Sequence, residues 1–111
     1  LQSVYTEIEI TNCQSMSFSI FSGGGTESFT CSGNNYNHTT NTFQASVTEN
    51  NSFIYLLQIT PSNSNITSCI DIITRVFHNN NLYETRTYSL GPNSISCSQI
   101  IVDEWYSIIA N

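Results

Sequence analysis

Residues 1–10 of the chain read LQSVYTEIEI. One face of this stretch carries three aliphatic side chains and a threonine, and the other face is mostly polar. The first set is Val4, Thr6, Ile8 and Ile10, and the second is Ser3, Tyr5, Glu7 and Glu9. A period of two predicts a half-buried β-strand. Because chain ends fray unless they are paired, we expect this strand to join a sheet, either its own or that of another copy.

The remaining residues predict further short strands separated by turns. Strands are expected at residues 15–21, 27–31, 42–48, 52–60, 66–78 (one long strand or a bent pair), 82–90, 94–102 and 105–110, with a polar loop at 32–41 and a break at Asp103 and Glu104. The triplets GGG (23–25), NNN (79–81) and GPN (91–93) supply turn residues. Residues 52–60 are apolar on both faces, as expected of a central strand covered on two sides.

About nine short strands with no helical period predict an all-β fold, a Greek-key, immunoglobulin-like β-sandwich. A chain of 111 residues is long enough for one such domain. The expected organisation is therefore an N-terminal strand, residues 1–10, followed by a single β-sandwich domain, residues 11–111.

Charge is scarce in this chain, which has two arginines, no lysine, eight acidic residues and a net charge of −6. Ser, Thr and Asn, about two-fifths of the residues, supply the polarity instead. The negative balance argues against nucleic acid and anionic membrane surfaces as partners. No apolar run approaches the ~20 residues of a membrane span. The start at Leu1 suggests that a signal peptide was removed.

The four cysteines predict disulfides. Cys13, Cys31, Cys69 and Cys97 include no closely spaced pair, and no histidine lies near them, so a metal site is not predicted. Free buried thiols are the alternative. Four cysteines allow three connectivities, of which sequence proximity favours Cys13–Cys31 with Cys69–Cys97. Disulfides indicate an oxidising compartment or a thermophilic cell.

Three sequons fit N-x-[ST] and predict N-linked glycans at Asn37, Asn50 and Asn65. Asn37 and Asn50 are expected in polar loops and Asn65 at the start of a strand, all accessible to a glycan. In a chain so rich in Asn, Ser and Thr, one or two sequons would occur by chance. Together with the cysteines, the sequons predict an extracellular, cell-surface protein. Apart from N-linked glycans, no cofactor is predicted.

The carboxylates are the only plausible acid–base set. A glycosidase needs two of them roughly 5–10 Å apart across a cleft. Glu7 and Glu9 share one strand face, which we expect to be a solvated edge. Asp71 is the one charge within an apolar strand, where hydrogen bonding or pairing with Arg75 is favoured over catalysis.

Other candidate chemistry is weaker. His38 and His78 adjoin no serine or cysteine nucleophile in a triad motif. The triglycine lacks the Lys-Ser/Thr pair of a phosphate-binding loop. Aromatic residues suited to sugar stacking, for which packing within the fold is the favoured alternative, are Trp105, Tyr106, Tyr83, Tyr88 and Tyr36. We therefore predict no enzyme.

The lysine-free, Ser/Thr/Asn-rich composition, the strand at residues 1–10, the three sequons and the paired cysteines resemble archaeal thread-type pilus subunits. Those proteins are glycosylated pilins that assemble by donor-strand complementation, and the resemblance covers the whole chain in character. Bacterial chaperone–usher pilins share this logic, but they usually have a small residue in mid-extension, where this chain has Thr6 and Glu7.

The resemblance implies that residues 1–10 insert into a groove on the next copy, where Val4, Thr6, Ile8 and Ile10 fill the groove. The partners would be copies of the same chain in a helical filament that supports adhesion or biofilm. Two alternatives remain. One is a monomeric cell-surface adhesion or glycan-binding domain with the first strand in cis, and the other is a secreted carbohydrate-active enzyme.

Overall fold

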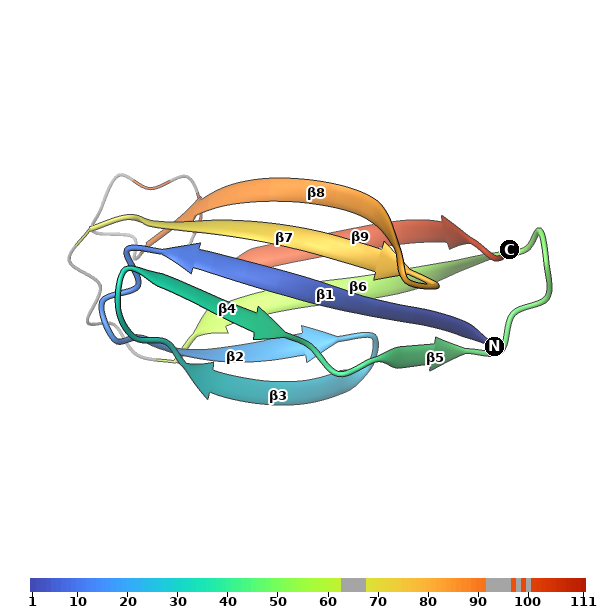
Figure 1. Cartoon of the computed structure of the whole chain (residues 1–111), viewed down its shortest axis with the longest axis horizontal. Helices are drawn as coiled ribbons and strands as arrows, with labels where there is room; N and C mark the ends of the chain where they lie inside the picture. Colours follow the sequence, from blue (N-terminus) through green and yellow to red (C-terminus); the bar gives the residue numbers. More distant parts are fainter. Residues whose placement is uncertain (63–67, 92–96, 98, 100) are drawn as a thin grey trace.

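A computed structural model describes residues 1–62, 68–91, 97, 99 and 101–111. These residues form nine strands and no helix, arranged as two antiparallel sheets (Figure 1). The predicted all-β sandwich of about nine strands is confirmed.

The two sheets differ in strand number. Sheet A has the order β4-β1-β7-β8, and β5 pairs with β1 beyond the end of β4; its strands are β1 (Gln2–Thr11), β4 (Asn35–Thr39), β5 (Phe43–Ala45), β7 (Ile70–His78) and β8 (Asn81–Leu90). Sheet B has the order β3-β2-β6-β9, with β2 (Ser17–Ser22), β3 (Gly25–Thr30), β6 (Ser52–Pro61) and β9 (Val102–Ile109). The start of β1 and the C-terminus lie at the same end of the sandwich (Figure 1).

Two hairpins use the turn residues that the sequence indicates. Gly23 and Gly24 join β2 to β3 with φ of 59° and 103°. Asn79 and Asn80 join β7 to β8 with φ of 50° and 66°. Two successive residues with positive φ match the twist of the flanking strands, which is why glycine and asparagine occupy these positions. A Cβ on Gly23 would also lie 2.5 Å from Cγ of Phe43.

The core lies between the sheets, where alternate residues of the strands point inward. Its fully buried members come from both sheets and include Val4, Ile8, Ile10, Phe18, Ile20, Tyr55, Leu57, Ile72, Val76 and Ile108. Two disulfides, Cys13–Cys31 and Cys69–Cys97, join the cysteines in the pairing that sequence proximity favours.

Some local predictions were wrong. The stretch 32–41 is not all loop, because β4 lies within it and pairs with β1. Asp103 and Glu104 do not break a strand, since both lie inside β9 and pair with β6. The strand predicted at 42–48 shortens to the three residues of β5. Residues 66–67, 94–96, 98 and 100 of two predicted strands fall outside the described residues.

The expectation for residues 52–60 was half right. β6 is a central strand of sheet B, between β2 and β9. Its inner face is buried, but Ile54 on the outer face is 52% exposed. Within one chain, β6 is therefore covered on one side only.

Candidate functional site

The candidate site is the position of β1 in sheet A. Its burial pattern alternates without a break from Gln2 to Thr11. Val4, Thr6, Ile8 and Ile10 are fully buried, so the predicted inward face of this strand is confirmed. The structure adds Gln2 to that face.

β1 is paired along both of its edges. On one side it pairs with β7, from Val4 opposite His78 to Thr11 opposite Asp71. On the other side it pairs first with β5 and then with β4. Figure 1 shows β1 running between these strands for nearly the whole length of the sandwich. Removal of β1 would therefore split sheet A and leave a groove whose base is formed by core side chains.

Thr6 carries polar contacts at the centre of the strand. Its Oγ1 lies 2.8 Å from the hydroxyl of Tyr55 on β6, and both residues are fully buried. Its main-chain N–H donates to Oγ1 of Thr40 at 2.9 Å, and its carbonyl accepts from the Thr40 N–H at 2.9 Å. One threonine thus connects β1 to sheet B and to the segment between β4 and β5.

The link from β1 to β2 is short and has an unusual backbone. Asn12, Gln14 and Ser15 have φ of 63°, 63° and 57°. L-residues avoid this left-handed region, at a cost of roughly 1–2 kcal/mol each and less for asparagine. Within the same link, Cys13 is fully buried and bonded to Cys31. The link is therefore conformationally strained but covalently anchored to the domain.

The outer face of β1 is not the solvated edge that we expected for Glu7 and Glu9, because β1 is central and both carboxylates are half-buried. Glu9 pairs with Arg75 at 3.1 Å. Asp71 is exposed, and the predicted pairing of Asp71 with Arg75 gives way to this contact with Glu9.

Polar side-chain contacts link the two sheets at both open sides of the sandwich. On the β3–β4 side, Nε2 of His38 lies 2.6 Å from Glu27, and the His38 ring stacks on Phe29. On the β8–β9 side, Arg86 bonds the carboxylates of Glu84 and Glu104.

The Arg86 guanidinium lies 4.1 Å from the ring centroid of Tyr106. Burial raises the pKa of Tyr88 beside this cluster, and Glu104 acts in the same direction. Glu84 and Glu104 are both held by one arginine, which gives these two carboxylates a structural explanation.

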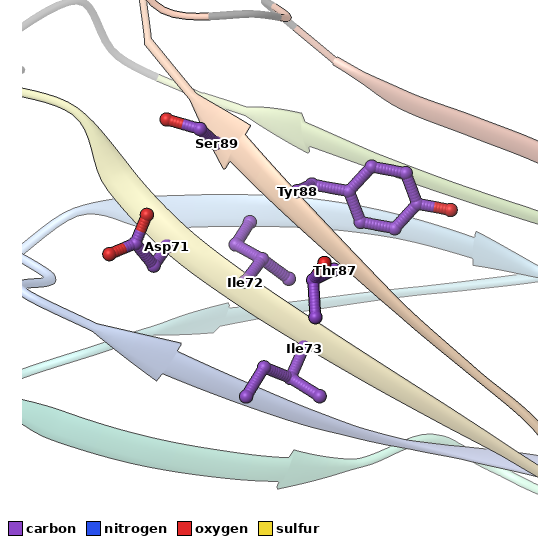
Figure 2. A pocket seen from close by; sticks show the side chains of 6 residues that line it. All are labelled: Asp71, Ile72, Ile73, Thr87, Tyr88 and Ser89. Atoms are coloured by element: carbon purple, nitrogen blue, oxygen red, sulfur yellow. The ribbon is translucent and has the colours of Figure 1, made fainter.

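A hollow of about 400 Å³ lies over β7 and β8 (Figure 2). Its lining residues are Asp71, Ile72, Ile73, Thr87, Tyr88 and Ser89. Asp71 is the one carboxylate among these described lining residues.

The aromatic candidates separate in the structure. Tyr106 is in the core, while Tyr36 stacks on Phe29 with ring centroids 5.3 Å apart. Trp105 on the outer face of β9 is 62% exposed, and Tyr83 is 42% exposed. Trp105 is therefore the best placed of the set to meet a ligand.

Two of the three sequons lie in the described part of the chain. Asn37 is exposed on the edge strand β4 rather than in a loop, and Asn50 is exposed in a turn with φ of 71°. Asn65 lies outside the described residues. Glycosylation at all three stays a prediction.

Within the described ranges, no helix is long and apolar enough to cross a membrane, and no group of histidine, cysteine and carboxylate residues has the arrangement of a metal site. Comparisons with protein-family models, curated proteins and solved structures find no match for this chain.

Proposed function

We propose that this chain is the structural subunit of an extracellular filament, in which β1 of one copy completes sheet A of the next. The observation that carries the proposal is the central position of β1, which is paired on both edges and attached to its domain through one short link. An identical strand from a second copy would make the same contacts.

Insertion of a strand at the β1 position is energetically favourable. Burial of Val4, Ile8 and Ile10 contributes about 1.5–3 kcal/mol for each side chain. Ladder hydrogen bonds to strands on both sides add about 1 kcal/mol each. A domain without β1 would expose this apolar floor and two unpaired strand edges, which is an aggregation hazard.

The link favours exchange over self-insertion. Self-insertion requires a left-handed φ angle of 63° at Asn12, and an extended backbone at this residue would release that strain. Strained hinge segments of this kind promote exchange of identical elements between copies. The Cys13–Cys31 disulfide fixes the pivot, so exchange moves residues 1–12 and leaves the domain intact.

The reach of β1 suits a filament. Ten residues at ~3.3 Å each extend roughly 33 Å, and the domain is 46 Å long. A released strand can therefore run along most of a neighbouring domain. Each copy gives one strand and receives one, and such a head-to-tail contact propagates into an open helical polymer unless it closes into a ring. The two disulfides are compatible with an extracellular site.

A permuted chain tests the proposal. Residues 1–11 are moved to follow Asn111 through a Gly/Ser linker of about four to six residues. A short linker suffices because Nε2 of Gln2 donates to the main-chain oxygen of Asn111 at 2.9 Å. The unaltered chain should form long polymers, and the permuted chain should be a folded monomer. If the unaltered chain also stays monomeric at high concentration, with no filaments by electron microscopy, the proposal is wrong.

The second candidate function is a cell-surface adhesion or glycan-binding domain with β1 in cis. The observation in its favour is exposed Trp105 on a sheet face, beside Gln58 and Asp103, which are hydrogen-bonded to each other at 3.3 Å. An exposed indole next to polar groups suits sugar stacking. Trp105 is the only tryptophan in the sequence, so quenching of intrinsic fluorescence by a glycan panel, absent in Trp105→Ala, would support this candidate.

A further inference from the structure

Gln2 is an unusual residue for the inner face of β1. It is only 6% exposed and opens a face on which the other members are Val4, Thr6, Ile8 and Ile10. Burial of a primary amide is unfavourable unless its hydrogen bonds are replaced. The surroundings of this side chain therefore indicate whether it has a specific partner.

The Gln2 amide is hydrogen-bonded on both of its ends. Its Nε2 donates to the main-chain oxygen of Asn111 at 2.9 Å. Its Oε1 accepts from Nε2 of His78 at 2.8 Å, from Nδ2 of Asn79 at 3.1 Å and from the N–H of Asn111 at 3.3 Å. Since Oε1 can only accept, His78 carries its proton on Nε2. These contacts come from the last residue of β7, the β7–β8 turn and Asn111.

Asn79 also holds the backbone next to Gln2. Its Oδ1 accepts from the Ser3 N–H at 2.9 Å, and its own N–H donates to the Ser3 carbonyl at 2.9 Å. Its Nδ2 reaches Oδ1 of Asn111 at 2.6 Å. Asn79 has a left-handed φ of 50°. Asn79 therefore contacts both the main chain of Ser3 and the side chain of Gln2.

We infer that His78, Asn79 and Asn111 form a carboxamide-binding socket, which selects the glutamine at position 2 of whichever strand fills the β1 position and so fixes its register. In a filament the selected residue would be Gln2 of another copy, and that part rests on the proposed function. The socket itself acts in any assembly state.

The socket distinguishes between strand registers that the apolar positions alone would accept. A slip of one residue turns the buried face to solvent and is excluded by the pattern alone. A slip of two residues keeps the same face inward, although it also moves Thr6 away from the hydroxyl of Tyr55. Such a slip would place Val4 in the socket, where the buried Nε2–H of His78 would lose its acceptor and Asn79 would lose one of two. Buried donors without an acceptor are costly, so this register is disfavoured.

The test compares Gln2→Leu with Gln44→Leu in the full chain. Gln44 lies on β5, next to the socket in the register with β1, but is exposed. Hydrogen exchange of residues 2–6, read by mass spectrometry, should be about tenfold faster in Gln2→Leu and within about twofold of the parent in the control. Equal exchange in Gln2→Leu and the parent would overturn the inference.

A Gln2→Glu chain tests the part played by His78. The ring centroid of His78 lies 5.9 Å from that of Phe53 and 6.4 Å from that of Tyr83. Of these two neighbouring rings in the described part of the chain, Tyr83 is the titratable one. A carboxylate at position 2 should pair with protonated His78. Residues 2–6 should then exchange more slowly below about pH 6.5 than above it, after correction for intrinsic rates, and a flat profile would exclude this contact.

The mass of each sample in native buffer separates the two ideas. Filaments together with a null result for Gln2→Leu would remove the socket alone. Monomers together with faster exchange in Gln2→Leu would remove the filament and retain the socket in cis.

Discussion

Loss of the Thr6–Tyr55 hydrogen bond should destabilise the sandwich in a way that a double-mutant cycle can resolve. Thr6→Val replaces the hydroxyl with a methyl group, and Tyr55→Phe removes only the phenolic oxygen. The two oxygens are 2.8 Å apart and both residues are fully buried. The Tyr55 ring also contacts Phe43 and Tyr106, each at 6.1 Å between centroids, which holds the ring in place in both variants.

Each single substitution leaves one buried hydroxyl without its partner, at a cost of about 1–3 kcal/mol. The double variant leaves neither hydroxyl, so it should be less destabilised than the sum of the single variants by about 1 kcal/mol or more. In a domain of this size, each single variant should melt roughly 3 °C or more below the parent.

Urea unfolding of the parent, both single variants and the double variant measures this coupling energy. The control is Thr85→Val, the same change at an exposed position of β8, which should be within about 0.5 kcal/mol of the parent. If the single effects add to within about 0.3 kcal/mol, Thr6 and Tyr55 do not act as a pair and the account of the β1 centre is wrong.

Other consequences are testable in the same protein. Burial lowers the pKa of His78 and raises the pKa of Tyr88. The free energy of unfolding should therefore decrease below about pH 6.5, where only the unfolded imidazole protonates, and above about pH 10, where only the unfolded phenol ionises. Melting temperatures with no plateau between these two pH values would contradict this. Replacement of Cys13 and Cys31 with alanine should cost roughly 3 kcal/mol or more, from the 18-residue separation that the disulfide closes, and an unchanged urea midpoint would refute it. Peptide mass spectrometry of native material should find glycans on the three sequon residues Asn37, Asn50 and Asn65. If all three are unmodified, the argument for an extracellular glycoprotein fails.

Local signals were enough to predict the fold class. The alternation in residues 1–10 identified the buried face of β1 because a strand repeats every two residues whatever it pairs with. Gly23, Gly24, Asn79 and Asn80 marked two hairpins because few other residues tolerate positive φ. These features depend on the backbone of a few neighbouring residues, and the sequence contains them directly.

Features that depend on distant partners were missed. β4 looked like a loop because its residues are polar, yet Tyr36 and His38 form a stack with Phe29 and the strand pairs with β1. Glu104 looked like a break, but Arg86 from another strand stabilises it inside β9. A polar side chain can occupy a strand when a residue remote in sequence pairs with it, and periodicity does not report such a partner.

The socket for Gln2 was missed for the same reason. In the sequence, Gln2 is one more polar residue next to an apolar pattern. Its partners lie 76, 77 and 109 residues away. The available hint was the period itself, because Gln2 falls in phase with Val4 and Thr6.

Cross-linking of β1 to β7 tests donation in trans most directly. Tyr5 and Phe77 are opposite each other in the register, and their rings stack 5.0 Å apart. Facing residues of antiparallel strands have Cα atoms about 4.5–5.5 Å apart, which suits a disulfide, so a chain carrying both Tyr5→Cys and Phe77→Cys should oxidise across this pair. The permuted chain with the same substitutions is the control and should give only a monomer band.

The measurement is a denaturing gel of the oxidised chain without reductant. A ladder of covalent multimers that collapses to monomer on reduction is the predicted result, because each strand would be locked into the next copy. A single monomer band, with the Tyr5→Cys to Phe77→Cys disulfide found within one chain by peptide mapping, would place β1 in cis and contradict the filament.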